Sequence, residues 1–557
     1  MIEISLESIG LILCTTIFLS MLLMPVASSL AHKVGAIDVP KSRSSHTTPK
    51  PRMGGLAMSL SLVIACLAFL PLNSYIVAFL SGLAVIVMTG VVDDMVEISP
   101  RWKFVGQILG ASLFVYLSGM EIEHIGDIVG MGDIRLGGAS FLFTVFCLVG
   151  AVNALNLADG LDGLAGGISL IASVFFAYFA WSVQGGELLI IAVALIGAIL
   201  GFLRYNSYPA RVFMGDSGSM MLGYVVAVLL ITLSHDAPRL PVPALAMVVA
   251  LPLIDTLLVM ARRVRYGRNP FHPDRTHLHH RLLELGFPHP AVVAVIYSVM
   301  LGFGLLAVAL HDRSDPVIFS NLVGTGLLIF SGVTLAQQTS FRYKAKTSKR
   351  LDSIQQTAIF KRISLWLKAT ARPVGVAILA ALLLPALFAP LLALSGNRVL
   401  ALYCSAALLV YFSFRTRRAA DQGILHGTLY LTIFALLLIY NLSAQYNPSW
   451  LDWYLNALSA ATLVWVVLKL FFSKHSEIIF ASGFELLILF VSWFVPFVAL
   501  EDLQISATVL QSVQRTCLLS IPFMLAMKIN IRNQGQNHWV SIPLVVALAI
   551  VATRAAM

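Results

Sequence analysis

Long apolar runs separated by short polar connections follow one another along almost the whole chain. A helix that crosses a bilayer needs about 20 mainly apolar residues, within a range of about 17–25. On that length, about eleven membrane spans are predicted before residue 338. They cover roughly 8–30, 55–71, 75–92, 104–120, 139–157, 163–183, 187–203, 217–234, 241–260, 291–310 and 317–336. The expected fold class is therefore all-α, a polytopic integral membrane protein.

A polar, basic segment follows the eleventh predicted span, and about seven further apolar stretches come after it. These stretches cover roughly 374–394, 399–414, 424–440, 452–472, 478–499, 506–527 and 538–553. We therefore divide the chain into a membrane-embedded part (1–337), a basic cytoplasmic linker (338–373) and an additional multi-span region (374–557). Part of the linker is expected to form an interfacial amphipathic helix.

Composition supports the membrane assignment. Hydrophobic residues make up 58% of the 557 residues and charged residues only 11%, whereas soluble domains carry about 25% charged residues. This excludes disorder, collagen, coiled coil and a disulfide scaffold. The five cysteines lie in apolar runs without metal-ligand spacing, so we interpret them as buried packing residues. The net charge of +10 is assigned to membrane loops rather than to nucleic-acid binding.

Lysine and arginine gather in alternate loops. Under the eleven-span count, basic loops follow the first, third, seventh, ninth and eleventh spans, all on one side of the membrane. The positive-inside rule assigns that side to the cytoplasm. The opposite loops are short or acidic, with Glu121, Glu123 and Asp127. Because Glu3 and Glu7 replace a basic leader, the first apolar run is expected to be a retained helix.

Polar side chains concentrate at the predicted cytoplasmic ends of the spans. These residues are Asp93 and Asp94 after the third span, Asn153, Asn156, Asp159 and Asp162 closing the fifth, Asp216 opening the eighth, and His277, His279 and His280 after the ninth. Charges at membrane helix ends are costly, and their default interpretation is functional. Their common face predicts a single site.

The residue types in this set indicate phosphate chemistry. Carboxylate and amide oxygens favour Mg²⁺ or Mn²⁺, and Mg²⁺ commonly binds one or two carboxylates together with substrate phosphates. Lys103, Arg275 and the histidines add positive charge for the same phosphates. A metal ion with a basic clamp is typical of phosphoryl transfer.

Each element also has a structural interpretation. The Asp93–Asp94 pair resembles a solvated helix end, Asp216 an N-cap and Asp255 a partner for Arg262 or Arg263. The HLHH run could bind Zn²⁺, but no cysteine or fourth ligand lies near it.

Spacing along the fifth predicted span constrains the site further. Three-residue steps rotate side chains by about 60°, so Asn156 and Asp159 converge. Asn153 and Asp162 point apart unless the helix breaks near Gly160 and Gly163.

Six stretches together resemble the polyprenyl-phosphate N-acetylhexosamine-1-phosphate transferases, the family that includes phospho-MurNAc-pentapeptide translocase. They are GAIDVPKSRSSHTTPKPRMGG (35–55), VVDDMVEISPRWKFVGQ (91–107), NALNLADGLDGLAGG (153–167), FMGDSGSMMLG (213–223), LPLIDT (251–256) and NPFHPDRTHLHHRLLELGF (269–287). The last is most similar to the GlcNAc-1-phosphate branch, which starts O-antigen and related cell-envelope glycans. The resemblance spans about 340 residues.

The resemblance implies a Mg²⁺-dependent enzyme of the bacterial inner membrane with its site facing the cytoplasm. Undecaprenyl phosphate would attack the β-phosphorus of a UDP-N-acetyl sugar and release UMP. By matching position, the metal ligands are Asp216 and Asn156, and the catalytic residues are Asp93, Asp94, Asp216 and His279. The substrate-binding residues are Lys103, Asn153, Asp159, Asp162, Arg275, His277 and His280.

The sequence leaves open which UDP-N-acetyl sugar is used and whether the attack is direct or passes through an aspartyl intermediate. It also leaves open the role of the last region. The region 374–557 departs from that family. We favour a docking module that recruits a later glycosyltransferase or forms a homodimer, with a second activity or no separable role as alternatives. The competing function for the whole chain is an ion-coupled carrier, because carboxylates at a membrane also mark ion pathways. The one-sided charges and the lack of an inverted sequence repeat oppose that function.

Overall fold

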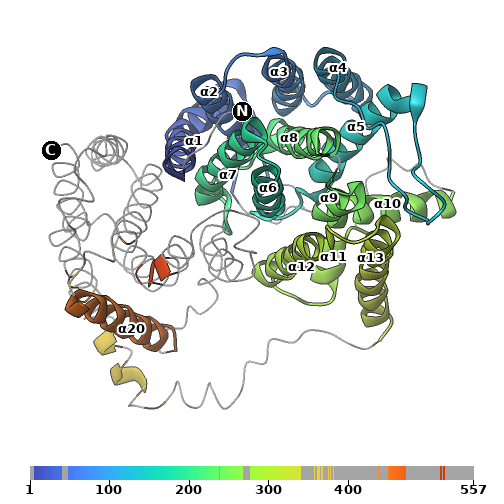
Figure 1. The fold of residues 1–557 in the computed structure, drawn as a ribbon. Coiled ribbons are helices and arrows are strands. Elements are labelled where there is room, and N and C mark those ends of the chain that lie inside the picture. Colours follow the sequence, from blue (N-terminus) through green and yellow to red (C-terminus); the bar gives the residue numbers. More distant parts are fainter. Residues whose placement is uncertain are drawn as a thin grey trace. The chain divides into compact units, whose positions relative to one another are not determined.

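The computed structural model describes the chain unevenly. It describes residues 6–40, 48–237, 239–267, 276–339, 357, 360–363, 365–367, 374, 377, 381, 437, 449–471, 515–516, 519–520 and 523. The chain divides into two compact units, Met1–Lys344 and Ala345–Met557. Figure 1 shows the described elements of both units.

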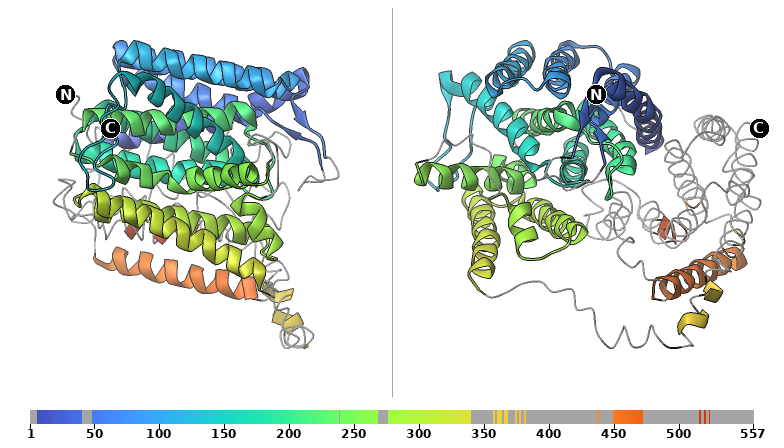
Figure 2. Two further views of the ribbon diagram at one scale, coloured as in Figure 1. Left: turned by 90° about the vertical axis from the view of Figure 1, so that its right-hand side faces the viewer. Right: turned by 180° about the vertical axis from the view of Figure 1, so that it is seen from behind.

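The first unit is built from helices, which confirms the all-α prediction. Its elements are α1 (Leu6–Val34), β1 (Ile37–Asp38), β2 (Lys50–Pro51), α2 (Gly54–Phe69), α3 (Ser74–Val96), α4 (Pro100–Ser118), the 3₁₀ turn η1 (Gly137–Ala139), α5 (Ser140–Ala158), α6 (Leu164–Ser182), α7 (Gly186–Asn206), α8 (Gly215–Asp236), α9 (Val242–Val248), α10 (Ala250–Arg265), α11 (Leu278–Glu284), α12 (His289–Leu310) and α13 (Asp315–Gln338). The short strands β1 and β2 pair antiparallel. Most of the long helices run side by side along a common direction (Figure 2).

Every segment predicted to span the membrane before residue 338 is helical, but the count of eleven is not confirmed. Among the described residues, eight helices are long and apolar enough to cross a bilayer, or nine if the bent pair α9–α10 counts as one. Helix α2 has only 16 residues. Helix α4 starts with a polar turn that contains Arg101 and Lys103, and it does not reach the required hydropathy. The chain is a multi-pass membrane protein.

The ninth predicted span is broken rather than continuous. Helices α9 and α10 meet at an angle of 84°. Pro252 lies at the third position of α10. Proline has no N–H to donate to the carbonyl of Val248, and its ring clashes with that carbonyl, so a straight helix cannot pass through this point.

Helix α8 lies at the centre of the first unit and packs against α2, α3, α5 and α6. Glycines bring its first turn unusually close to two neighbours. A Cβ on Gly55 of α2 would lie 2.0 Å from the backbone nitrogen of Gly218, and a Cβ on Gly90 of α3 would lie 2.4 Å from the Cα of Ser217. Small residues permit such close helix contacts in membranes. They place Asp216 beside the end of α3.

The second unit is described mainly through α20 (Ser449–Phe471), which coincides with the predicted stretch 452–472. The other six predicted stretches and most of the linker 338–373 lie largely outside the described residues. Within this unit, Arg515 donates a hydrogen bond from Nη2 to Oδ1 of Asp452 at 2.8 Å. Charges within membrane regions are typically paired in this way.

Candidate active site

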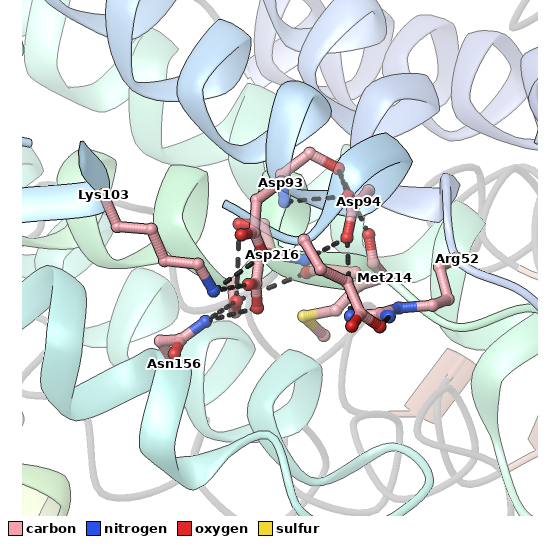
Figure 3. Close-up of polar contacts among 11 residues, drawn as sticks. Arg52, Asp93, Asp94, Lys103, Asn156, Met214 and Asp216 are labelled. Carbon is pink, nitrogen blue, oxygen red and sulfur yellow. Dashed lines mark hydrogen bonds and ion pairs between the residues drawn. The ribbon is translucent and has the colours of Figure 1, made fainter. Parts of the chain in front are cut away.

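The C-terminal end of α3 and the N-terminal ends of α4 and α8 bring three predicted residues together (Figure 3). The Nζ of Lys103 lies 2.7 Å from Oδ2 of Asp93, and it also pairs with Oδ2 of Asp216. Asp93 is buried, and within the described part of the chain its Oδ1 has no hydrogen-bond partner. Two carboxylates therefore converge on one cationic group, and one of their oxygens is available for a further contact.

The two neighbouring aspartates of α3 have different surroundings. Oδ1 of Asp94 accepts a hydrogen bond from the backbone N–H of Asp216 at 2.8 Å. Its Oδ2 accepts from the N–H of Ser217 at 3.1 Å and from the Ser217 hydroxyl at 2.7 Å. Asp94 thus satisfies free N–H groups at the start of α8 and places a negative charge at the positive end of that helix. The alternative in which Asp216 itself caps α8 is wrong.

A tight turn before α8 makes this arrangement possible. Gly215 has a φ of +70°, and a Cβ there would lie 2.0 Å from the carbonyl oxygen of Arg52 and 2.4 Å from Oδ2 of Asp94. Only glycine adopts such a conformation without strain while allowing backbone and carboxylate to approach this closely.

The predicted residues at the end of α5 separate into two groups. Asn156 donates from Nδ2 to Oδ1 of Asp216 and to Oγ of Ser219, both at 2.8 Å. Asn153 instead donates to Oε1 of Gln107 at 2.6 Å and to the carbonyl of Val149 at 2.8 Å. Asn156 therefore belongs to the carboxylate cluster, whereas Asn153 fastens α5 to α4.

The helix does break near Gly160 and Gly163, because α5 ends at Ala158 and α6 begins at Leu164. In the intervening loop, Oδ2 of Asp162 accepts the N–H of Ala210 at 2.8 Å. Burial, reinforced by the nearby charges of Asp216, Asp162 and Asp94, raises the pKa of Asp159 to about 7. Asp159 therefore retains a proton more readily than an exposed aspartate does.

The three histidines occupy the short helix α11 and the residue before it. Nδ1 of His277 lies 2.9 Å from Oδ2 of Asp255, and the N–H of Leu278 donates to Oδ1 of the same carboxylate at 2.9 Å. Asp255 thus anchors the start of α11, and its expected pairing with Arg262 or Arg263 is replaced by His277. The ring centroids of His279 and His280 are 4.2 Å apart. Arg275 lies outside the described residues.

His279 joins α11 to the loop between α5 and α6. A Cβ on Gly160 would lie 2.3 Å from Nε2 of His279, so the ring rests directly against this glycine. Burial, with smaller effects from His280, His277 and His289, lowers the pKa of His279 to about 3. Its ring is therefore neutral at physiological pH. Within the described residues, the buried Nε2 has no hydrogen-bond partner.

Lys50, Arg52 and Phe213 border the site but were not among the predicted site residues. The buried Lys50 places its Nζ 5.0 Å from the centroid of the Phe213 ring. The Phe213 N–H donates to the Pro51 carbonyl at 2.8 Å, which joins β2 to the segment before α8. Arg52 lies 3.9 Å from Oδ1 of Asp94 and 3.6 Å from Oε1 of Glu97. The sequence showed Lys50 and Arg52 as members of a basic loop and of the stretch 35–55 that resembles the family, without a role for either.

The oxygen atoms of this site fit a divalent cation whose coordination is completed by the substrate. Among the described residues no group of three or more His, Cys, Asp or Glu side chains forms a metal site. Asp93 and Asp216 nevertheless share one cationic partner, and Oδ1 of Asp93 is unpaired in the described part of the chain. Mg²⁺ commonly takes only one or two carboxylates and obtains its remaining ligands from water and phosphate. Asn156 would contribute its amide oxygen after a rotation of the side chain.

Carboxylates and a lysine at helix ends, with the histidines of the short helix α11, form a polar site in a multi-pass membrane protein. The chain belongs to glycosyl transferase family 4, whose sequence profile matches residues 76–234. This confirms the predicted family.

Three relatives show what the chain resembles. A probable undecaprenyl-phosphate N-acetylglucosaminyl 1-phosphate transferase of Bacillus subtilis is 32% identical over 339 residues, which cover 59% of this chain and 93% of the relative. A decaprenyl-phosphate N-acetylglucosaminephosphotransferase of Mycobacterium tuberculosis is 35% identical, covering 55% of this chain and 82% of the relative. An undecaprenyl-phosphate alpha-N-acetylglucosaminyl 1-phosphate transferase of Salmonella typhi is 31% identical, covering 55% and 84%.

Proposed function

We propose that this protein transfers N-acetylglucosamine 1-phosphate from UDP-N-acetylglucosamine to undecaprenyl phosphate and releases UMP. The product would start a lipid-linked glycan of the bacterial cell envelope, such as O-antigen. The convergence of Asp93, Asp216 and Lys103 at one point is the main support. Paired carboxylates and a lysine suit a diphosphate with its cation, and the names of the relatives indicate the sugar and the lipid.

In the proposed reaction, an oxygen of undecaprenyl phosphate forms a bond to the phosphorus that carries the sugar. The bond from that phosphorus to the bridging oxygen breaks, and UMP leaves with the electron pair. Asp93 would accept the remaining proton of the lipid phosphate, because its Oδ1 is unpaired among the described residues. Asp94, whose oxygens bind the start of α8, would hold Asp216 in place.

The remaining residues would bind and orient the donor. Mg²⁺ at Asp216 and Asn156, when bound, supplies positive charge to the diphosphate. Lys103 would contact a phosphate oxygen, and Asp159 and Asp162 would lie near the uridine. His277, His279 and His280, together with Arg275, would contact the sugar and its phosphate. A neutral His279 donates or accepts a hydrogen bond without adding charge.

We further propose that the site faces the cytoplasm from the bacterial inner membrane. Lys50, Arg52, Arg101 and Lys103 all lie at the end of the first unit that carries the site. The loop between α4 and η1 follows the other end of α4, away from Lys103. It holds the acidic residues Glu121, Glu123, Asp127 and Asp133. This asymmetry follows the positive-inside rule.

A transfer assay tests the reaction. The purified full-length protein is incubated with undecaprenyl phosphate, Mg²⁺ and radiolabelled UDP-GlcNAc, UDP-GalNAc, UDP-QuiNAc, UDP-FucNAc or UDP-MurNAc-pentapeptide. We expect lipid-linked label from UDP-GlcNAc, its loss in Asp216→Asn, and its retention in Asp312→Asn, which changes an exposed aspartate after α12. If only a different UDP-sugar gave lipid-linked label, that sugar nucleotide would take the place of UDP-GlcNAc as the proposed donor. Absence of transfer from every donor by folded protein would refute the proposal.

A further inference from the structure

A polar network on the side of α11 away from His279 fastens this helix to the end of α13. Arg281 donates from Nε to Oε1 of Gln337 at 2.9 Å and from Nη2 to Oγ1 of Thr334 at 2.7 Å. Gln337 in turn donates from Nε2 to Oε2 of Glu284 at 3.2 Å. We call these four residues the α11 clasp. They connect two segments that are more than 50 positions apart in the sequence.

The partners of Arg281 are oriented by the chemistry of their own groups. The hydroxyl of Thr334 donates its hydrogen to the carbonyl of Phe330 at 2.7 Å, so its lone pairs face Arg281. A guanidinium group can only donate, which requires the amide oxygen of Gln337 to face it. The amide nitrogen then faces Glu284. Donors and acceptors therefore alternate through the whole clasp.

Arg281 is 4% exposed, so its N–H groups depend on these protein acceptors rather than on water for hydrogen bonds. Burial, with a smaller effect from Arg262, lowers the pKa of Arg281, whereas the charges of Asp255 and Glu284 raise it. A buried charged donor that loses its acceptor is strongly destabilised. Removal of one clasp acceptor is therefore expected to release the side chain and, with it, the helix.

Helix α11 is short and packs against α12 as well as α13. It contains only seven residues, Leu278–Glu284, and ends where Gly286 adopts a φ of +91°. Isolated helices of this length are unstable, so its position depends on tertiary contacts. Leu278 and Leu282 are buried, and Asp255 holds the first turn.

The geometry of the helix connects the clasp to the site. Successive residues advance by about 100°, so Arg281 projects about 200° from His279, almost on the opposite side. His279 contacts the α5–α6 loop at Gly160, and Arg281 contacts α13. If α11 lost its contacts with α13, the helix would shift, and His279 on its opposite side would shift relative to Gly160.

We propose that Arg281 is a positioning residue, which acts through the α11 clasp to hold His279 against the loop between α5 and α6. The expected effect on substrate binding rests on the proposed function. The expected effect on the stability of α11 does not depend on turnover. The clasp would favour binding of the sugar nucleotide and have little effect on the lipid acceptor.

Two pairs of variants in the full-length protein test the proposal. Thr334→Val removes the hydroxyl without changing the size of the side chain, and Thr334→Ser retains it. Gln337→Met removes both polar groups, and Gln338→Met makes the same change at the exposed neighbouring residue, which takes no part in the clasp. For each variant, hydrogen exchange of the α11 amides is measured together with KM for UDP-GlcNAc and for undecaprenyl phosphate.

We expect Thr334→Val and Gln337→Met to accelerate exchange in α11 by about 10–100-fold, the factor for one lost hydrogen bond to a charged group. The donor KM should rise several-fold while the acceptor KM and the exchange of α8 stay unchanged. Thr334→Ser and Gln338→Met should match the wild type. Unchanged exchange in both acceptor variants would overturn the clasp. Equal increases in both KM values, with faster exchange throughout, would show only a general loss of stability and overturn the positioning role.

The exchange experiment also separates this inference from the proposed function. If the wild type transfers no sugar phosphate, the proposed function fails, and exchange in α11 still decides whether the clasp holds the helix.

Discussion

The carboxylate cluster and the histidine helix serve the same candidate site but are held in different ways. Asp93, Asp94 and Asp216 lie at the ends of the long helices α3 and α8, whose backbones meet at glycine contacts. The histidines lie on or beside α11, which has seven residues and is fixed by side-chain hydrogen bonds to α10 and α13. The difference suggests a rigid site for phosphate chemistry next to a more adjustable element for the donor.

The largest effect is expected in the rigid cluster. Asp93→Asn should lower turnover by about 10²–10⁴-fold, the usual contribution of a general base. Asp216→Asn should abolish activity, because it removes both a partner of Lys103 and the proposed metal ligand. Both proteins should insert and fold, as judged by monodispersity and thermal midpoint. Substantial activity in both would contradict the site assignment.

Asp94→Asn should separate positioning from reaction within the cluster. An amide can still accept from one N–H of α8, but its NH₂ group cannot accept from Ser217. We expect a lower thermal midpoint and partial activity, with the pH dependence of turnover retained. Ser217→Ala should produce a smaller change in the same direction. A fully folded Asp94→Asn protein with as large a loss of turnover as Asp93→Asn would indicate instead that Asp94 reacts directly.

His279→Gln should have a smaller effect, about 10–100-fold in the specificity constant, which corresponds to one hydrogen bond to a charged substrate group. Its effect on stability depends on pH. The pKa of His279 is about 3 in the folded protein and about 6.5 when unfolded. The unfolded state therefore binds the proton first, and native stability is lost as pH falls below about 6.5. The thermal midpoint of His279→Gln should decline less than that of the wild type between pH 7 and pH 5, and equal declines would contradict the buried, neutral histidine.

The smallest effect is expected from removing the second unit. A chain that ends after residue 344 retains the first unit and the α11 clasp. We expect the truncated protein to keep most of its transferase activity if the second unit is accessory. A well-folded, monodisperse truncation without activity would show that the second unit contributes to catalysis. The same protein, compared with the full chain by light scattering, would show whether 374–557 supports a dimer.

Helical character and the residue types of the site were predictable because each depends on local sequence. Apolar runs predicted where the long helices before residue 339 lie, but not the short helix α11, which falls in the predicted loop after the ninth span. The glycines between Asp159 and Leu164 allowed for the break after α5. The 84° bend between α9 and α10 was missed although Pro252 marks it. A hydropathy window averages over such a residue and joins the two helices into one span.

Partnerships between distant segments were not predictable from one sequence. Asp94 caps α8 because Gly90 allows α3 to approach Ser217 closely, a contact between positions 127 residues apart. Asp255 has arginines nearby in sequence but pairs with His277. Arg281 and Gln337 give no joint signal in the sequence, since each alone looks like an ordinary polar residue near a helix end.

The most direct test of the central claim is the identity and amount of the nucleotide released by the purified wild type. With UDP-GlcNAc and undecaprenyl phosphate, we predict one UMP for each lipid-linked sugar formed, and no UMP without the lipid. Release of UDP in place of UMP would show transfer of the sugar without its phosphate. Release of UMP without the lipid would show hydrolysis, and either result would contradict the proposed transfer at Asp93 and Asp216.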